Sequence, residues 1–249
     1  PAGAVSARSY SDGTNLTYTY NDDGSLTASN SLSLTTNSEG EVVESNGLTI
    51  ARDPGGRVTG VTYDTGKTVT YTYDGRDLPI TVTDWVGGVT TLAYDDMGRM
   101  TTITRPTGVT TTYAYDDDGA IISVIDRNGS NQIISRNLLT RDARGHVISA
   151  TRNVPSSPSP SDSYQTFFYN DASEIGPYNY DALGRLLDDG DRTFTWDLAG
   201  RLESRTEGGS TSNYDYDGAG KLVSRSEGGT TKSFVWNYAF PIPVVATVE

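Results

Sequence analysis

The sequence predicts an all-β fold of tandem antiparallel β-hairpins that form one curved, spiral sheet. Three observations support this prediction. A short motif with a turn signature recurs at intervals of about 20 residues along most of the chain. The residues between the turns alternate with period 2, so that Phe194 and Trp196 share one face while Thr193 and Thr195 share the other. Thr, Tyr, Val and Ile, which favour strands, dominate these stretches, and no segment has the periodicity of an amphipathic helix.

The recurring motif is an aromatic residue, an acidic or amide residue, two variable residues, Gly, a basic residue and an aliphatic residue. The strong copies are Tyr94-Asp95-Asp96-Met97-Gly98-Arg99-Met100, Tyr115-Asp116-Asp117-Asp118-Gly119-Ala120-Ile121, Tyr180-Asp181-Ala182-Leu183-Gly184-Arg185-Leu186, Trp196-Asp197-Leu198-Ala199-Gly200-Arg201-Leu202 and Tyr216-Asp217-Gly218-Ala219-Gly220-Lys221-Leu222. Weaker copies begin at Tyr20, Thr36, Arg52, Tyr73 (followed by Asp74) and Arg141, and a shortened copy begins at Trp236.

The chemistry of the motif predicts a tight turn. An Asp side chain at the first turn position can accept a hydrogen bond from the backbone amide two residues further on. The Gly supplies the positive φ of a type I turn closed by a G1 bulge. In three copies we therefore expect a positive-φ Gly and an Asp bonded to amides of its own turn: Asp181 with Gly184, Asp197 with Gly200, and Asp217 with Gly220.

A second turn is expected midway between successive copies, so that each period holds two strands of about 6–8 residues. Pairs rich in Gly and Asn suit the two-residue hairpin loops of the primed types. We predict such loops at Gly87-Gly88, Asn128-Gly129, Gly208-Gly209 and Gly228-Gly229, and a midway turn also at Thr107-Gly108.

Hydrophobic residues make up only 35% of the chain, and Tyr and Thr must therefore carry much of the packing. A two-layer sandwich would need a richer apolar face, and a single extended sheet that coils by its own twist needs less. Aromatic residues that recur at the same point of each repeat predict ladders of stacked rings along the sheet.

The whole chain, residues 1–249, is predicted to be one repeat segment. One stretch rich in Pro and Ser, residues 155–163, interrupts it and should be an exposed loop, because Pro cannot donate to a strand ladder. We expect an insertion between strands, since the same motif resumes afterwards. A linker between two domains is the alternative.

Composition excludes several classes of function. The chain has no Cys and one His, which leaves no thiol nucleophile and no Cys-based metal site. Its net charge is 19 − 32 = −13, which disfavours nucleic acid and anionic membranes as partners. No apolar run is long enough for a transmembrane helix. We therefore expect no nucleic-acid partner, no membrane insertion, no tightly bound cofactor and no catalytic metal.

Candidate catalytic and binding residues are few. His146 occupies the basic position after a turn Gly and is expected to be a half-exposed residue beside that turn, and no Gly-x-Ser-x-Gly elbow supports a hydrolase. The acidic pairs and triplets at Asp22-Asp23 and at Asp116-Asp117-Asp118 could hold a weak Ca²⁺ site, but the turn role of Asp is sufficient to explain them. Exposed aromatic residues could form a platform for sugars, but their regular placement favours a structural role.

The pattern Tyr-x-Tyr-Asp-x-x-Gly-Arg-Leu resembles the YD repeat of the RHS family. The best matches are Tyr178-Asn179-Tyr180-Asp181-Ala182-Leu183-Gly184-Arg185-Leu186 and Tyr214-Asp215-Tyr216-Asp217-Gly218-Ala219-Gly220-Lys221-Leu222, and the resemblance extends over nearly the whole chain. The family includes bacterial polymorphic toxins, the shell-forming subunits of insecticidal Tc toxins, wall-associated proteins and animal teneurins. The resemblance implies a β-strand spiral that forms part of a hollow β-shell.

The resemblance also implies the function. We expect a non-catalytic shell segment that encapsulates a C-terminal effector or passenger polypeptide. An extracellular adhesion module of the same fold is the alternative. The family's self-cleaving C-terminal core does not occur here, and residue 1 is Pro, so we expect a piece of a longer bacterial protein that is secreted or associated with the cell surface. Its partners would be the rest of that protein and the enclosed polypeptide, or another copy bound through open strand edges.

Overall fold

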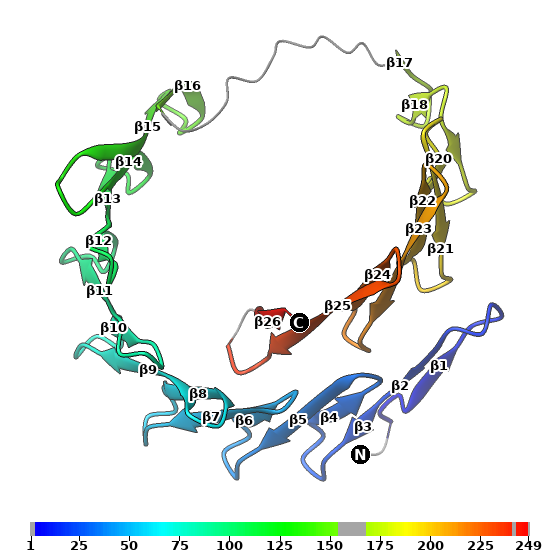
Figure 1. Cartoon of the computed structure of the whole chain (residues 1–249), viewed down its shortest axis with the longest axis horizontal. Coiled ribbons are helices and arrows are strands. Elements are labelled where there is room, and N and C mark those ends of the chain that lie inside the picture. Colours follow the sequence, from blue (N-terminus) through cyan, green and yellow to red (C-terminus); the bar gives the residue numbers. More distant parts are fainter. Residues whose placement is uncertain (1–2, 154–167, 241–242, 249) are drawn as a thin grey trace. The chain divides into compact units, whose positions relative to one another are not determined.

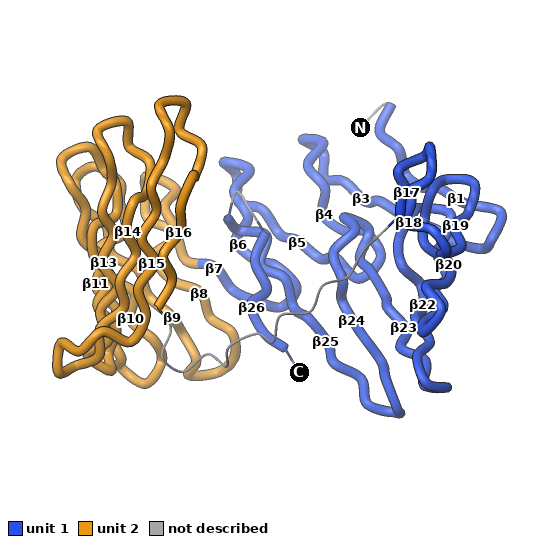
Figure 2. Tube along the Cα trace, turned by 90° about the horizontal axis from the view of Figure 1, so that it is seen from above, with its two compact units in different colours: residues 1–50, 163–249 blue, residues 51–162 orange. Residues whose placement is uncertain are grey.

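The computed structural model describes residues 3–153, 168–240 and 243–248. The predicted Pro- and Ser-rich loop at 155–163 lies outside the described residues. Within them every regular element is a β-strand, which confirms the all-β prediction. The chain divides into two compact units, one formed by Pro1–Ile50 with Ser163–Glu249 and the other by Ala51–Asp162 (Figure 2).

The second unit is an antiparallel meander in which each strand pairs with the next one along the chain (Figure 1). Short turns between alternating segments allow only this neighbour-to-neighbour pairing. Its strands are β8 (Val58–Asp64), β9 (Lys67–Tyr73), β10 (Pro79–Thr83), β11 (Val89–Tyr94), β12 (Met100–Thr104), β13 (Thr110–Tyr115), β14 (Ile121–Arg127), β15 (Ile133–Arg141) and β16 (Val147–Asn153).

The first unit contains hairpins from both ends of the chain. The N-terminal strands are β1 (Ala7–Ser9), β2 (Asn15–Thr17), β3 (Thr19–Tyr20), β4 (Leu26–Ser29), β5 (Leu32–Thr36), β6 (Val42–Ser45) and β7 (Leu48–Arg52), which leads into the other unit. The C-terminal strands are β17 (Phe168–Tyr169), β18 (Ile175–Gly176), β19 (Asn179–Tyr180), β20 (Leu186–Asp188), β21 (Arg192–Trp196), β22 (Leu202–Glu207), β23 (Ser210–Tyr216), β24 (Leu222–Glu227), β25 (Thr230–Asn237) and β26 (Val244–Val248). Strands β3 to β7 pair in order, as do β19 to β26.

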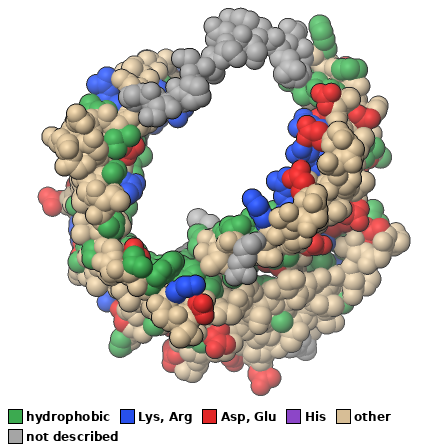
Figure 3. Space-filling model, viewed as in Figure 1, with side chains coloured by type: hydrophobic (Ala, Val, Ile, Leu, Met, Phe, Trp, Pro, Cys, Tyr) green, Lys and Arg blue, Asp and Glu red, His purple; other side chains and the backbone are tan. Residues whose placement is uncertain are grey.

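The apolar core is small, as the composition predicts. Among the described residues, six hydrophobic side chains are buried: Leu16, Leu32, Leu48, Ile50, Val58 and Val61. Many other strand residues, Thr, Tyr and Arg among them, remain partly exposed. Positive and negative side chains lie next to one another over the C-terminal repeats and form no single-sign patch (Figure 3). Hydrogen bonds and ion pairs must therefore contribute an unusually large share of the fold's specificity.

In both units the turns alternate between the two ends of the strands. We call the ends that carry the motif turns the repeat-turn edge, and the opposite ends the midway-turn edge. The midway loops at Gly208-Gly209 and Gly228-Gly229 have two residues, both with positive φ, as predicted.

The prediction of two-residue loops is wrong at Gly87-Gly88 and Asn128-Gly129, where the turns have the longer geometry of the motif turns. The amide of Gly87 bonds to the carbonyl of Asp84, while Asp84 Oδ1 accepts bonds from Val86 and Gly88. The Asp side chain thus stabilises a type I turn with a bulge. The turns at 107–108 and 128–129 have the same longer geometry. Pro106 favours the first central position of a type I turn, and Asn128 caps its own turn.

Candidate functional site

The repeat turn is the structural unit from which the candidate site is built. Gly184, Gly200 and Gly220 have φ of 75°, 83° and 80°, which confirms the predicted left-handed position. Asp181 Oδ1 accepts hydrogen bonds of 2.9 Å from the amides of Leu183 and Arg185. Asp217 accepts hydrogen bonds from the amides of Ala219 and Lys221, and Asp197 accepts one from the amide of Arg201, which confirms the second half of the prediction.

In the copies with Arg in the basic position, the second carboxylate oxygen of the repeat Asp binds that Arg. Arg99 Nε lies 2.7 Å from Asp95 Oδ2, and Arg185 Nε lies 2.6 Å from Asp181 Oδ2. The hydrogen bond from Arg99 lowers the pKa of Asp95, and the backbone amide of Arg185 is the main cause of the lowered pKa of Asp181. In these copies the motif's Asp and Arg therefore form one charge-neutral unit within the turn.

The basic residue of a copy also lies over the aromatic ring of the next copy along the chain. The cation lies about 5 to 6 Å from the ring centroid, which is the range of a cation–π contact. The pairs are Arg57 with Tyr73 at 5.0 Å, Arg99 with Tyr115 at 4.7 Å, Arg185 with Trp196 at 5.9 Å, Arg201 with Tyr216 at 5.3 Å and Lys221 with Trp236 at 5.1 Å.

The polar atom of each aromatic ring completes the link between copies. The Tyr115 hydroxyl donates a hydrogen bond of 2.7 Å to the carbonyl of Met100, the residue directly after Arg99. Tyr73 and Tyr94 donate to the corresponding carbonyls at 2.6 and 2.8 Å, and Trp196 and Trp236 do so through Nε1 at 2.8 Å. The prediction of stacked aromatic ladders is thus wrong in detail, because five of the repeat rings pack against a cation of the preceding copy.

A seam within the first unit joins hairpins from opposite ends of the sequence. The amide of Leu198 donates to Asp12 Oδ2 at 2.7 Å, and the amide of Gly218 donates to the carbonyl of Ser29 at 3.2 Å. The third contact is made by Ser45 Oγ, which accepts a hydrogen bond from the amide of Tyr238 at 2.9 Å. From one of these contacts to the next, both partners move on by one hairpin. The acceptors lie at midway turns and the donors at repeat turns, so the midway-turn edge of β1–β7 docks on the repeat-turn edge of β21–β25.

The three amides that donate across the seam occupy the same turn position. Each belongs to the residue that directly follows the repeat Asp or Asn, at 197, 217 and 237. Inside the turn, the Asp side chain engages the amides two and four residues further on, and the Gly amide binds the Asp carbonyl. The amide next to the Asp is therefore the one that the turn leaves available to an outside acceptor.

The fit at the middle of the seam is close. A Cβ atom on Gly218 would lie 1.5 Å from Ser29 Oγ, so only Gly is accommodated there. Asn46 Nδ2 adds a hydrogen bond of 2.9 Å to the carbonyl of Trp236. A polar cavity of about 600 Å³ lies beside the first two contacts, with Asn15, Asn30 and Asp215 in its lining. The seam is thus joined at the turns and is not packed continuously.

Comparison with known families identifies this architecture. The family model of the teneurin YD-shell matches residues 108–241, which are 134 of the 249 residues, and the RHS repeat model matches residues 52–89. The chain belongs to the teneurin YD-shell family. No curated protein matches the chain.

Several solved structures resemble this YD-shell chain weakly. A chain of the Tc holotoxin pore of Photorhabdus luminescens is 15% identical over 97% of this chain and 15% of that chain, with a TM-score of 0.37. TcdB2-TccC3 without its hypervariable C-terminal region is 16% identical over 97% of this chain and 16% of that one, with a TM-score of 0.36. A porin-like protein from Bacteroides uniformis is 15% identical over 94% and 90% of the two chains, with a TM-score of 0.29. The chain thus spans about 15% of the length of the Tc toxin chains that it matches.

Copies of the YD motif without a basic residue after the turn Gly depart from the linked arrangement, and the copies at Tyr115 and Tyr73 are examples. The copy at Tyr115 has Ala120 in the basic position, so Asp116 caps its turn through the amide of Ala120 without an ion pair. The copy at Tyr73 has Leu78 there, and Arg76 binds Asp74 at 2.9 Å and the carbonyl of Asp95 instead. These copies keep the turn geometry but have no basic residue at the position that Arg99 holds in the copy at Tyr94.

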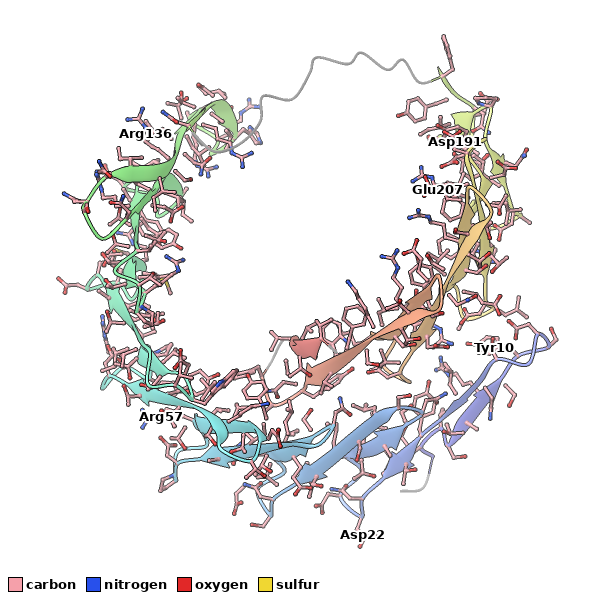
Figure 4. The ribbon with its side chains drawn as sticks, in the orientation of Figure 1. Tyr10, Asp22, Arg57, Arg136, Asp191 and Glu207 are labelled. Carbon is pink, nitrogen blue, oxygen red and sulfur yellow. The ribbon has the colours of Figure 1, made fainter. Side chains whose placement is uncertain are left out.

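The candidate catalytic and metal-binding residues of this YD-shell segment do not form a common site among the described residues. His146 binds Asp142 at 3.2 Å, and its side chain is 72% exposed, which is more than the half-exposure that its place beside the turn suggested. The described residues contain no cluster of three potential metal ligands, and Asp22 points away from its turn into solvent (Figure 4). They also contain no helix long and apolar enough to cross a membrane.

The residues on the N-terminal side of the seam were not anticipated from the sequence. Asp12, Ser29, Ser45 and Asn46 lie in or beside midway turns and have no counterpart in the YD motif. The small residue Gly218 next to a repeat Asp was a signal for a close approach of another chain segment, but its partner is nearly 190 residues away.

Proposed function

We propose that this segment is a non-catalytic part of the wall of a YD-shell, and that the wall encloses a C-terminal effector or passenger polypeptide of a longer protein. The seam between β1–β7 and β21–β25 carries this proposal. A wall built from a ribbon of hairpins requires that one stretch of ribbon bind another along its edge, and the turn amides supply the bonds for this.

The polar chemistry of the segment supports a structural role. The repeat Asp residues accept hydrogen bonds from turn amides, and their second oxygen binds Arg of the same copy or, at Asp217, the hydroxyl of Tyr238. The single His is exposed beside a turn and contacts only Asp142. A hydrolase would need a nucleophile, a base and an orienting group within hydrogen-bond reach of one another, and the described side chains do not assemble that set.

Membership of the YD-shell family supports the choice of partner and location. The chain covers a small part of the Tc toxin chains that it resembles, and we propose that the rest of a longer protein completes the wall. We further propose that this protein is secreted or associated with the cell surface. Pairing of another copy with the open edges of β16 or β26 is the alternative partner, since each pairs on one side only among the described residues.

Electron cryomicroscopy of the intact natural protein tests the proposal. We expect density for this segment in a continuous wall and additional polypeptide density inside it, together with protease resistance of the enclosed part. A wall without internal density, combined with binding of the outer face to a cell-surface protein, would favour the adhesion module. Conversion of many substrate molecules per molecule of the purified segment would contradict the non-catalytic role.

A further inference from the structure

Outside the seam, the same two edges of the hairpin ribbon are exposed in the second unit. The amides that follow the repeat Asp in the motif turns are those of Gly75, Asp96 and Asp117. None of these amides has an acceptor among the described residues. They occupy the turn position from which Leu198, Gly218 and Tyr238 donate across the seam. The repeat-turn edge of this unit therefore presents a row of unused donors at the turn position that the seam uses.

Large apolar side chains mark the two edges of this unit. Met97, in the repeat turn between β11 and β12, is 77% exposed. Val86 and Trp85, in the midway turn between β10 and β11, are 82% and 49% exposed. These turns lie at opposite ends of β11, so each edge carries an apolar tip. Exposed aromatic and apolar residues of this kind commonly anchor protein interfaces.

The charges favour contact between unlike edges. The repeat turns at 74–78, 95–99 and 116–120 contain seven Asp and two Arg, which is 2 − 7 = −5. The midway turns at 84–88, 105–109 and 128–132 contain one Asp and one Arg, which is 1 − 1 = 0. Two repeat-turn edges would repel one another, whereas a repeat-turn edge facing a midway-turn edge is not opposed by charge.

We propose that the second unit binds a second copy of this chain head to tail, with the repeat-turn edge of one copy on the midway-turn edge of the other. The amides of Gly75, Asp96 and Asp117 donate to carbonyls of the partner's midway turns, and Met97 packs against Trp85 and Val86 of the partner subunit. The contact reproduces the edge pairing of the seam. It goes beyond the shell function proposed above and does not depend on what the wall encloses. Such a heterologous contact leaves one edge free at each end, so association continues with concentration.

Two substitutions at exposed turn tips test this contact without disturbing the fold. Val86→Asp places a charge on the apolar tip. Asp96→Pro removes the donating amide, and Pro is favoured at this position of a type I turn, where Pro54 already stands in the turn at 53–57. Asp96→Ala controls for the loss of charge. Ile148→Asp, on the 67% exposed Ile148 of β16, tests association through the open strand edge instead.

Sedimentation velocity over a wide range of concentration gives the result. We expect the average mass of the natural chain to rise with concentration, and Val86→Asp and Asp96→Pro each to weaken association about tenfold or more, equivalent to about 1.4 kcal/mol. Asp96→Ala and Ile148→Asp should associate as the natural chain does. A natural chain that stays monomeric throughout, or association that only Ile148→Asp abolishes, overturns the proposal.

Discussion

Gly218 and Ser29 are joined by a hydrogen bond of 3.2 Å from the amide of one to the carbonyl of the other, in a contact that leaves no room for a Cβ atom. The two residues come from hairpins at opposite ends of the chain. Ser29 is the last residue of β4, and Gly218 directly follows the buried Asp217 of a repeat turn. One stretch of hairpins binds another here through a turn amide, at a position where only Gly is small enough to fit.

Substitution of Gly218 should therefore destabilise the first unit. We expect Gly218→Ala to lower the free energy of unfolding by about 1–3 kcal/mol, since the new methyl group must displace Ser29. Gly75→Ala is the matched control, because Gly75 holds the same turn position and a Cβ atom added there would meet no other atom within 4 Å. Urea unfolding of both variants checks this, and equal effects at the two positions would remove the seam from the explanation.

The link between successive copies can be tested at Arg99. Arg99→Met removes the ion pair with Asp95 and the cation over Tyr115 but keeps the length of the side chain. We expect a loss of about 1–2 kcal/mol, from one half-exposed charge-assisted hydrogen bond and one cation–π contact. Arg144→Met, at an exposed turn residue, should change the unfolding free energy by less than about 0.5 kcal/mol. Similar losses in the two variants would contradict the linked arrangement.

The turn glycines predict a second, local effect. Gly200→Ala forces a side chain into a backbone conformation with φ of 83°, where nothing else crowds the new atom. We expect a loss of about 1–2 kcal/mol from backbone strain alone. Ala199→Gly in the same turn serves as the comparison, and calorimetry of the two variants should show the larger loss for Gly200→Ala.

The repeat carboxylates make stability depend on acid. Hydrogen bonds lower the pKa of Asp53, Asp95 and Asp181 below the ordinary value of 3.8, chiefly from the Arg57 side chain, the Arg99 side chain and the Arg185 amide respectively. A lowered pKa in the folded state means that these groups contribute stability above the unfolded pKa and lose it as the pH falls through the folded value.

Stability should therefore be nearly constant from neutral pH to about pH 5 and should fall below about pH 4. Replacing Asp95 and Asp181 together by Asn should reduce this fall, because Asn keeps the turn cap and cannot titrate. Asn170 shows that the amide serves the same cap, since its Oδ1 accepts bonds from the amides of Ala172 and Glu174. A double variant with an unchanged acid transition would contradict the assignment.

Local chemistry made the fold predictable. The Asp and Gly of the motif define a turn by themselves, so the conformations of Gly184 and Gly200 follow from their spacing. The pairing order follows from the short connections. The midway turns were harder to predict, because a capping Asp84 or Asn128 outside the small-residue pair lengthens the loop.

Features that depend on distant residues were not predictable in the same way. The aromatic ladder was expected from the recurrence of the rings alone, but the packing of Tyr115 also depends on the guanidinium of Arg99 in the preceding copy. The seam depends on Asp12, Ser29 and Ser45, whose partners are nearly 190 residues away. A single sequence holds no signal that relates two residues at such a separation unless a repeat period links them.

Hydrogen exchange at the turn amides, resolved by NMR, tests most directly the claim that the ribbon docks edge to edge to build a wall. The amides of Leu198, Gly218 and Tyr238 donate across the seam, and those of Asp96, Asp117 and Ala182 hold the same turn position without an acceptor among the described residues. At low protein concentration, where copies do not associate, we predict slow exchange for the first three amides and fast exchange for the second three. Equally fast exchange at all six amides would contradict the account.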